Sequence, residues 1–350
     1  TKPSHSTCCH GKPERPDYLL WCSAIAIVSL YLLKLLVIGM EFSHAAGHPW
    51  YLTLCQSVFE LINTMWWGIL LGILMVGILA RIPRDLVMAI LGTGKGLTGL
   101  LRATAAGLLL DLCSHGILMV GAKLYERGAS NGQMMAFLIA SPLNSFSLTL
   151  ILISLVGLAW TLVFIAGSLL IALLSGIVFQ YLSDSGTIPE NPNRIQINDD
   201  IPIKQTFIAL IKNANYGPKS TLLLFWQGLK ESRMVLRWIL FGVLLASILR
   251  SLIEQQQFAE YFGPSLLGLG LTLVAATLIE VCSEGSTPIA ADLLTRAQAP
   301  GNSFAFLMTG VATDYTEIMV IKDTTKSWRI ALLLPAITVP QIITLAILMN

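Results

Sequence analysis

The segment Asp111-Leu112-Cys113-Ser114-His115-Gly116 recurs 169 positions later as Glu280-Val281-Cys282-Ser283-Glu284-Gly285. Both copies read acid-x-Cys-Ser-polar-Gly, and both interrupt long apolar stretches. The match continues downstream without a gap, with Ala136-Phe137-Leu138 aligned to Ala305-Phe306-Leu307. An ionisable group, a thiol and a glycine at matching interruptions predict a protein built from two repeats.

The composition places these repeats in a membrane. Apolar residues make up 55% of the 350-residue chain and charged residues only 12%, whereas soluble domains carry about twice that share of charge. Several windows of about 18 or more residues are almost free of charge, enough to cross a bilayer core of about 30 Å. We therefore expect an all-α polytopic membrane protein.

Lysine and arginine residues at the ends of the apolar segments predict the topology. The expected full spans are residues 19–40, 58–80, 132–156, 158–182, 238–252, 301–321 and 330–349. Each motif lies between helical arms too short to cross a bilayer, so we expect two re-entrant hairpins. Placing most cations in the cytoplasm makes the second repeat inverted relative to the first, with Arg250 and Arg296 outside, against the trend.

These features divide the chain into five parts. The parts are a flexible Cys/His tail (1–17), a first transmembrane span with an outer loop (18–50), the first repeat (51–182), a cytoplasmic linker with an interfacial helix (183–220) and the second repeat (221–350). The interfacial helix is expected at residues 207–214 from apolar residues at helical spacing, and a partly ordered connector is the alternative.

The two hairpin tips carry the candidate binding site. The residues expected to bind substrate are Cys113, His115, Cys282 and Glu284. Two thiols with an imidazole and carboxylates suit Cu(I), Zn(II) or a trivalent arsenic species better than hard cations. The alternative is that the cysteines are small apolar packing residues, as free cysteines often are.

Further polar residues have candidate supporting roles. The residues assigned to proton coupling or to support of the ligands are Asp111, Glu280, Asn144, Asp314 and Glu317, because an acid at bilayer depth is costly. Helix–helix hydrogen bonding is the alternative, above all for Asn144. The tail residues His5, Cys8, Cys9 and His10 are candidates for metal recruitment, with a plain disordered terminus as the alternative.

At these residues the chain resembles the ArsP-type permease family of bacterial inner-membrane transporters. The resemblance is carried by Leu112-Cys113-Ser114-x-Gly116, by the run 136–142 followed by Asn144, and by Cys282-Ser283-Glu284 through Ala291. It covers roughly residues 57–345 and implies efflux of thiophilic toxicants, either trivalent arsenicals or copper and zinc. His115 stands where the family pattern leads us to expect a second cysteine, which favours a metal cation.

We therefore expect a secondary permease, not an enzyme, in a bacterial inner membrane with its N-terminus in the cytoplasm. It would export a thiophilic metal or metalloid and couple to protons, because no ATP-binding signature is present. The expected partners are membrane lipid, the small substrate and protons, without nucleic acid or a permanently bound cofactor, and a homo-oligomer is compatible with the sequence.

Other functions remain open. The same architecture suits a permease for a small sulfur-containing or other anion, bound at the N-termini of the hairpin helices. A membrane thiol oxidoreductase would use Cys113 and Cys282 as a redox pair, although the chain has no Cys-x-x-Cys motif. A membrane scaffold without transport would leave the repeated acids unexplained.

Overall fold

The computed structural model describes residues 18–38, 50–79, 96–109, 114–126, 128–193, 226, 229, 233–279 and 283–350. Regular secondary structure within these residues is entirely α-helical, as the apolar runs predict. The Cys/His tail and the interfacial helix expected at 207–214 lie outside the described residues.

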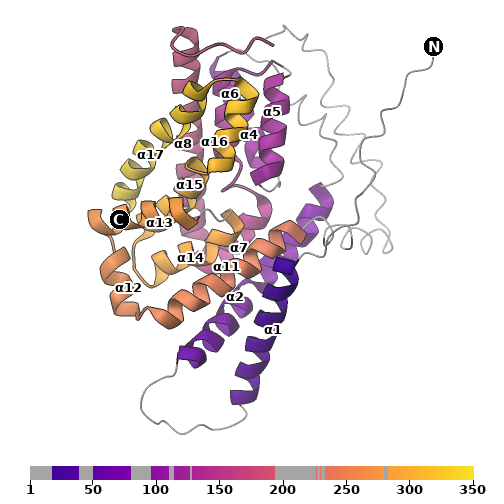
Figure 1. Cartoon of the computed structure of the whole chain (residues 1–350), viewed down its shortest axis with the longest axis vertical. Coiled ribbons are helices and arrows are strands. Elements are labelled where there is room, and N and C mark those ends of the chain that lie inside the picture. The colour runs from indigo at the N-terminus through magenta and orange to yellow at the C-terminus, as the bar shows by residue number, and fades with distance from the viewer. Residues whose placement is uncertain are drawn as a thin grey trace, which may run out of the picture.

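The described helices form two groups along the chain (Figure 1). In the first half they are α1 (Tyr18–Ile38), α2 (Trp50–Leu79), α4 (Leu97–Leu109), α5 (Ser114–Glu126), α6 (Asn131–Ala140), α7 (Phe146–Val156) and α8 (Leu158–Asp184). In the second half they are α11 (Arg233–Leu252), α12 (Gln255–Phe262), α13 (Leu266–Ile279), α14 (Ser283–Thr295), α15 (Pro300–Ala312), α16 (Tyr315–Thr325) and α17 (Trp328–Met349).

The 169-residue repeat of the sequence recurs in the helix boundaries. When the numbering is shifted by 169 positions, the bounds of α5 coincide with those of α14, and the bounds of α7 coincide with those of α16. The first residues of α4 and α6 coincide in the same way with those of α13 and α15. Helices α4 to α8 and helices α13 to α17 therefore form two copies of one helix order.

Polar residues between the helices fix where each helix begins. The Ser130 hydroxyl accepts a hydrogen bond from the backbone N–H of Gln133 (3.2 Å), and the Gln133 side chain accepts one from the Ser130 N–H (2.9 Å). This capping box begins α6. The Ser145 and Asp314 side chains cap α7 and α16 by accepting one hydrogen bond each, from the backbone N–H of Leu148 and of Thr316. Between α7 and α8 stands Gly157, whose φ of 83° lies in the left-handed region that favours glycine.

Both repeats bring two helices into backbone contact at an equivalent glycine. A Cβ added to Gly132 of α6 would lie 2.5 Å from the carbonyl oxygen of Gly176 in α8. At the equivalent position of the second repeat, a Cβ on Gly301 of α15 would overlap the carbonyl oxygen of Ala346 in α17. Any larger residue would push these helix pairs apart, so the same small residue is required twice.

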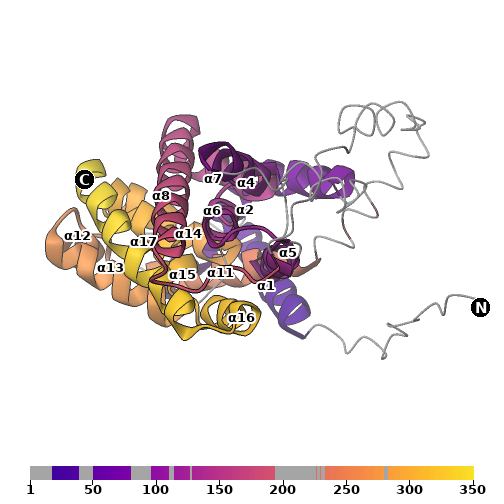
Figure 2. The same ribbon diagram turned by 90° about the horizontal axis from the view of Figure 1, so that it is seen from above.

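The long helices α8 and α17 pack against each other and run in opposite directions. Near the start of α8, the space where Gly167 lacks a Cβ is filled by the Met349 methyl at the end of α17. Eight residues further along α8, the Ser175 hydroxyl accepts a hydrogen bond from Gln341, eight residues earlier in α17 (3.0 Å). Figure 2 shows α17 on the left of the molecule beside α8.

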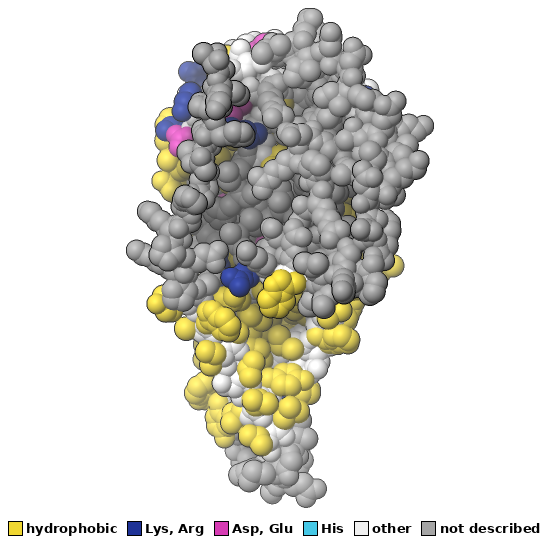
Figure 3. Space-filling view, turned by 90° about the vertical axis from the view of Figure 1, so that its right-hand side faces the viewer, with side chains coloured by type: hydrophobic (Ala, Val, Ile, Leu, Met, Phe, Trp, Pro, Cys, Tyr) yellow, Lys and Arg dark blue, Asp and Glu magenta, His cyan; other side chains and the backbone are white. Residues whose placement is uncertain are grey.

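Several described helices are long and apolar enough to cross a membrane. Three qualify alone, namely Tyr18–Leu36 within α1, Leu158–Asp184 and Trp328–Met349, and two bent pairs raise the number to five. The pairs are α11 with α12, bent by 106°, and α15 with α16, bent by 40°. Large apolar side chains such as Trp21 and Leu36 of α1 are exposed, and hydrophobic side chains cover the narrow end formed by α1 and α2 (Figure 3). A helical membrane protein is thus confirmed, while re-entrant hairpins and inverted orientation stay predictions.

The interruptions of the helices differ from expectation in three places. Gly116 and Gly285 do not break their helices, because they belong to the first turns of α5 and α14. The span expected at 301–321 is divided at Thr313 and Asp314, which matches the division of the first repeat at 141–145. The short helix α12 was not anticipated, since its eight residues carry few apolar positions.

Candidate functional site

The repeated motif falls at the junctions between α4 and α5 and between α13 and α14. Four of its candidate residues, Asp111, Cys113, Glu280 and Cys282, lie outside the described residues. His115 belongs to the first turn of α5, but its side chain is outside the described set. The described part of the chain holds no cluster of three or more His, Cys, Asp or Glu residues arranged for a metal ion, so the predicted thiolate site remains a prediction.

Glu284 is the motif residue whose side chain the structure places. It lies in the first turn of α14 and is only 4% exposed. The next residue, Gly285, packs its carbonyl oxygen against Gly242 of α11, where a Cβ would overlap it. This backbone contact holds the motif end of α14 inside the protein, so the Glu284 carboxylate is buried at the start of that helix.

The helices that carry the motifs pack against the opposite repeat. Helix α14 of the second repeat contacts α7 of the first, and α5 of the first repeat contacts α16 of the second (Figure 1). Because α5 corresponds to α14 and α7 corresponds to α16, the two contacts are equivalent. Helix α5 therefore lies beside α16, which follows Asp314 and contains Glu317. Helix α14 lies beside α7, which begins shortly after Asn144.

Asn144 has a structural role in the part of the chain that the structure describes. Its amide nitrogen donates to the Ala140 carbonyl (2.5 Å) and to the Ser168 hydroxyl (3.0 Å), and its oxygen accepts from Ser168 (3.2 Å). These bonds join the end of α6 to α8, which corresponds to the alternative of helix–helix hydrogen bonding. The geometry gives no support to a proton-coupling role for this side chain.

Asp314 and its neighbour Thr313 organise the equivalent interruption of the second repeat. The Asp314 carboxylate accepts a hydrogen bond from the backbone N–H of Thr316 (2.7 Å) and caps α16. The Thr313 and Thr277 hydroxyls are hydrogen-bonded to each other (3.1 Å) and so connect this interruption to α13. The polar residues between α15 and α16 thus lie against an arm of the second motif.

Glu317 is buried without a partner. It stands in the first turn of α16, is 4% exposed, and forms neither a hydrogen bond nor an ion pair with any residue that the structure describes. Its counterpart in the first repeat is Leu148, which is fully buried. Burying a carboxylate without a partner is costly.

A second buried acid, Asp292, was not anticipated. Near the end of α14, its two carboxylate oxygens accept hydrogen bonds from the Arg250 Nε of α11 (both 2.9 Å). Arg250 also lies 3.6 Å from the half-exposed Glu60 of α2, and Arg296 lies 3.8 Å from Asp292. Arg250 and Arg296, which the predicted topology places outside the cytoplasm, therefore both form ion pairs with the buried Asp292. The sequence signal was Asp292 four residues before Arg296, one helical turn apart.

A family model described as a predicted permease, ArsP_1, matches residues 52–350. The match includes both repeats and α11, and it leaves out α1. No curated protein and no solved structure matches the chain.

Replacing Asp292 by Asn is expected to lower the free energy of unfolding by about 3–5 kcal/mol, because two largely buried arginines would lose their shared carboxylate. Thermal denaturation of the purified protein in detergent measures the effect. Glu60→Gln removes only the half-exposed partner and should cost much less.

Glu126→Gln serves as the control, because Glu126 forms an exposed pair with Lys123. Exposed pairs contribute about 1 kcal/mol or less. Equal effects of Asp292→Asn and Glu126→Gln would contradict the buried-pair interpretation.

Proposed function

We propose that this chain, which belongs to the ArsP_1 family of predicted permeases, exports a thiophilic metal or metalloid in exchange for protons. One observation carries the proposal: the two Cys-bearing motifs stand at equivalent places in the chain, ending in the first turns of α5 and α14, in two copies of one helix order. Broken helices related by an internal repeat place substrate sites near the bilayer midplane in secondary transporters. We further propose a bacterial inner membrane as the location and a cytoplasmic N-terminus.

The antiparallel packing of α8 and α17 supports an inverted relation between the repeats. Helices α8 and α17 are the equivalent last helices of the two copies, yet they run antiparallel to each other. Two parallel repeats would place equivalent neighbouring helices in the same direction. An inverted pair instead allows one hairpin to enter from each side of the membrane, so that the two tips approach a common site.

The proposed ligand set is Cys113, His115, Cys282 and Glu284. Thiolates and imidazole bind zinc, copper and trivalent arsenic in preference to hard cations. The burial of Glu284 at the start of α14 supports a polar site at that tip. Asp111 and Glu280, each two residues before a cysteine, would support these ligands, and the tail residues His5, Cys8, Cys9 and His10 would deliver metal to the cytoplasmic side.

Glu317 is the carboxylate best suited to carry the coupling proton. A proton neutralises a buried acid and removes the cost of its charge, whereas a carboxylate already held by arginine, such as Asp292, loses its partner when it is protonated. Asp314 at the start of the same helix is a second candidate. Because α16 packs against α5, a change of charge at Glu317 would change the electrostatic potential at α5, the first motif helix.

A permease for a small sulfur-containing or other anion is the second candidate within the transporter class. The N-termini of α5 and α14 point their first backbone N–H groups toward the motif interruptions, and helix N-termini bind anions. A thiol oxidoreductase would need Cys113 and Cys282 to form a reversible disulfide. Transport measurements on the Cys282→Ser variant distinguish the thiophilic metal permease from these alternatives.

Topology is tested with reporters at the ends of the two equivalent helices. A reporter inserted after Asp184, at the end of α8, is expected to report the cytoplasmic side, and one fused after Asn350, following α17, the opposite side. The reporter is alkaline phosphatase, and its activity in intact cells that express each fusion measures the side of the membrane on which it lies. Both reporters on one side would contradict the inverted arrangement.

Substrate identity is tested with everted membrane vesicles and a panel of zinc, Cu(I), arsenite and methylated trivalent arsenic. One species is expected to accumulate with the wild-type protein and to fail with Cys282→Ser, because the variant removes a soft ligand. Cys22→Ser is the matched control, since Cys22 is an exposed thiol of α1 outside both repeats. Accumulation unaffected by Cys282→Ser would favour the anion permease.

Proton coupling is tested with Glu317→Gln, which keeps the shape of the side chain and removes its titration. Uptake driven by an imposed pH gradient is expected to lose most of its dependence on that gradient. Asp323→Asn is the control on the same helix, because Asp323 is exposed beside Lys322. An unchanged gradient dependence in Glu317→Gln would rule out Glu317 as the coupling group.

A further inference from the structure

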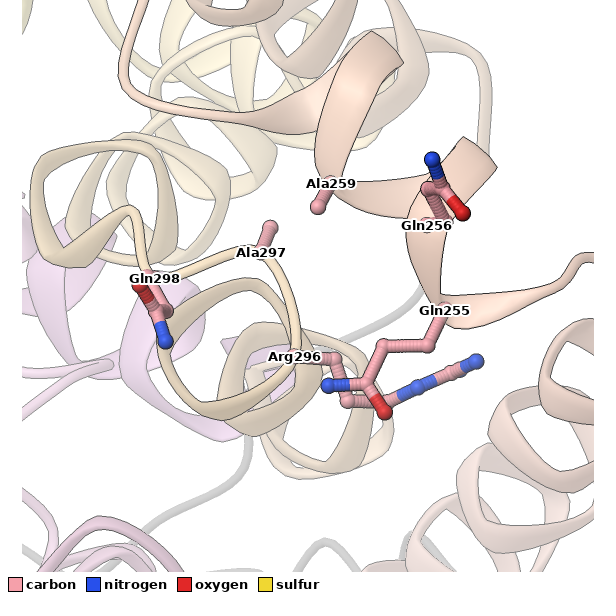
Figure 4. Close-up of a pocket in the computed structure, with 6 residues that line it drawn as sticks. All are labelled: Gln255, Gln256, Ala259, Arg296, Ala297 and Gln298. Atoms are coloured by element: carbon pink, nitrogen blue, oxygen red, sulfur yellow. The ribbon is translucent and has the colours of Figure 1, made fainter.

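The two motif helices, α5 and α14, are held at the ends away from their motifs by different interactions. At the end of α14, the buried Asp292 is paired with Arg250 and Arg296. Arg296 also donates a hydrogen bond to the Ile253 carbonyl oxygen, just after α11 (3.2 Å), and lies beside Gln255, the first residue of α12 (Figure 4). Charged groups therefore tie this end of α14 to the corner between α11 and α12.

The corresponding end of α5 is held by the strap, which is residues 185–193 and directly follows α8. The Asn191 amide nitrogen donates to the carbonyl oxygen of Tyr125 in the last turn of α5 (2.6 Å) and to that of Ala129 shortly before α6 (2.8 Å). The last carbonyl groups of a helix have no partner within the helix. The strap therefore supplies hydrogen bonds to the backbone at the end of α5.

Two side chains of the strap are buried, those of Ile188 and Asn191, and its other residues are exposed. Ile188 packs into the hydrophobic core. From the start of α6, the Asn131 amide donates to the Pro189 carbonyl oxygen (2.8 Å). Hydrogen bonds between neutral groups contribute less than it costs to break a buried ion pair. The strap is therefore easier to release from α5 than the arginines are from α14.

We propose that the strap is a latch on the first motif helix. While the strap is bound, the end of α5 is fixed, and when the strap is released, α5 shifts against α6 and α16 while α14 stays in place. In the part of the chain that the structure describes, α5 packs mainly on α6 and α16, whereas α14 packs on α11, α15 and α7. A weakly held element opens at a lower free-energy cost than the whole fold.

The latch connects the first motif to the part of the chain between the repeats, because the chain continues from Asn193 into that part. For its effect on transport the inference rests on the proposed function, in which the motif at the start of α5 binds the substrate. The restraint of α5 by the strap does not depend on that function and is measured separately.

The test compares two asparagines of the strap by amide hydrogen–deuterium exchange of the purified protein in detergent. Asn191→Ala removes both hydrogen bonds to the end of α5. Asn193→Ala is the matched control, because the Asn193 side chain is exposed. Ile188→Ala removes the other buried side chain of the strap and leaves Asn191 in place. Peptides from α14 serve as the internal reference in every variant.

In Asn191→Ala and Ile188→Ala, peptides that cover residues 117–131 are expected to exchange about tenfold faster or more, because the strap no longer holds the end of α5. Asn193→Ala should exchange like the wild type, and peptides from α14 should keep the wild-type rate throughout. An unchanged rate at 117–131 would overturn the proposal. An equal acceleration in α14 would also overturn it, since that result means a general loss of stability.

A second measurement uses everted vesicles and whichever of zinc, Cu(I), arsenite or methylated trivalent arsenic the wild type accumulates. The maximal uptake rate is expected to rise about threefold or more in Asn191→Ala and to stay unchanged in Asn193→Ala, because the released position of α5 becomes more populated. Faster exchange with an unchanged or lower uptake rate would make the strap a static tie and overturn the latch. If the wild type accumulates none of these species, the proposed function fails, and the exchange measurement still decides whether the strap restrains α5.

Discussion

Backbone contact at two equivalent glycines is the constraint on which the rest of this fold depends. Apolar surface is not scarce in a membrane, so the hydrophobic effect does not drive helices together there, and close packing through small residues takes its place. Gly132 lets α6 touch α8, and Gly301 lets α15 touch α17. The contacts of α8 with α17, at Gly167 with Met349 and at Ser175 with Gln341, then join the two copies. Each motif helix packs both on its own repeat, α5 on α6 and α14 on α15, and on the opposite repeat, α5 on α16 and α14 on α7.

The second demand on the fold is the pairing of polar groups inside it. The breaks between helices place polar backbone and side-chain groups in the interior of the protein. Most of these groups that the structure describes form hydrogen bonds. Asn144 bonds to Ser168, and Asp314 caps its own helix. Against that background Glu317 is the buried acid that forms neither a hydrogen bond nor an ion pair with any residue that the structure describes.

The sequence predicted the helical class, the repeat and most helix positions, because apolar runs and a 169-residue self-match are direct signals. It was wrong about Gly116 and Gly285, which were expected to break helices but lie in the first turns of α5 and α14. Glycine is permissive rather than disruptive at a helix start, where few backbone hydrogen bonds are at stake. Glu317 was found because an acid inside an apolar stretch is conspicuous. Asp292 was missed because its partner Arg250 lies 42 residues away and is brought to it only by the packing of α11 on α14.

The repeats share a scaffold but not its chemistry, and this difference has a physical basis. Position 123 of α5 is an exposed lysine, whereas its counterpart at 292 of α14 is a buried aspartate. The end of α14 is covered because α11 packs along it, while the main contacts of α5 in the described part of the chain are with α6 and α16. A second pair of equivalent buried positions also differs between the repeats, with the apolar Leu148 in the first and the acidic Glu317 in the second. Under the proposed proton coupling, equivalent backbones would allow the two halves to exchange conformations, and unequal side chains would give those conformations different affinities for a proton. A carrier needs both properties, because a fully symmetric protein would bind its ions equally well in either state and a ligand with equal affinity for two states shifts neither.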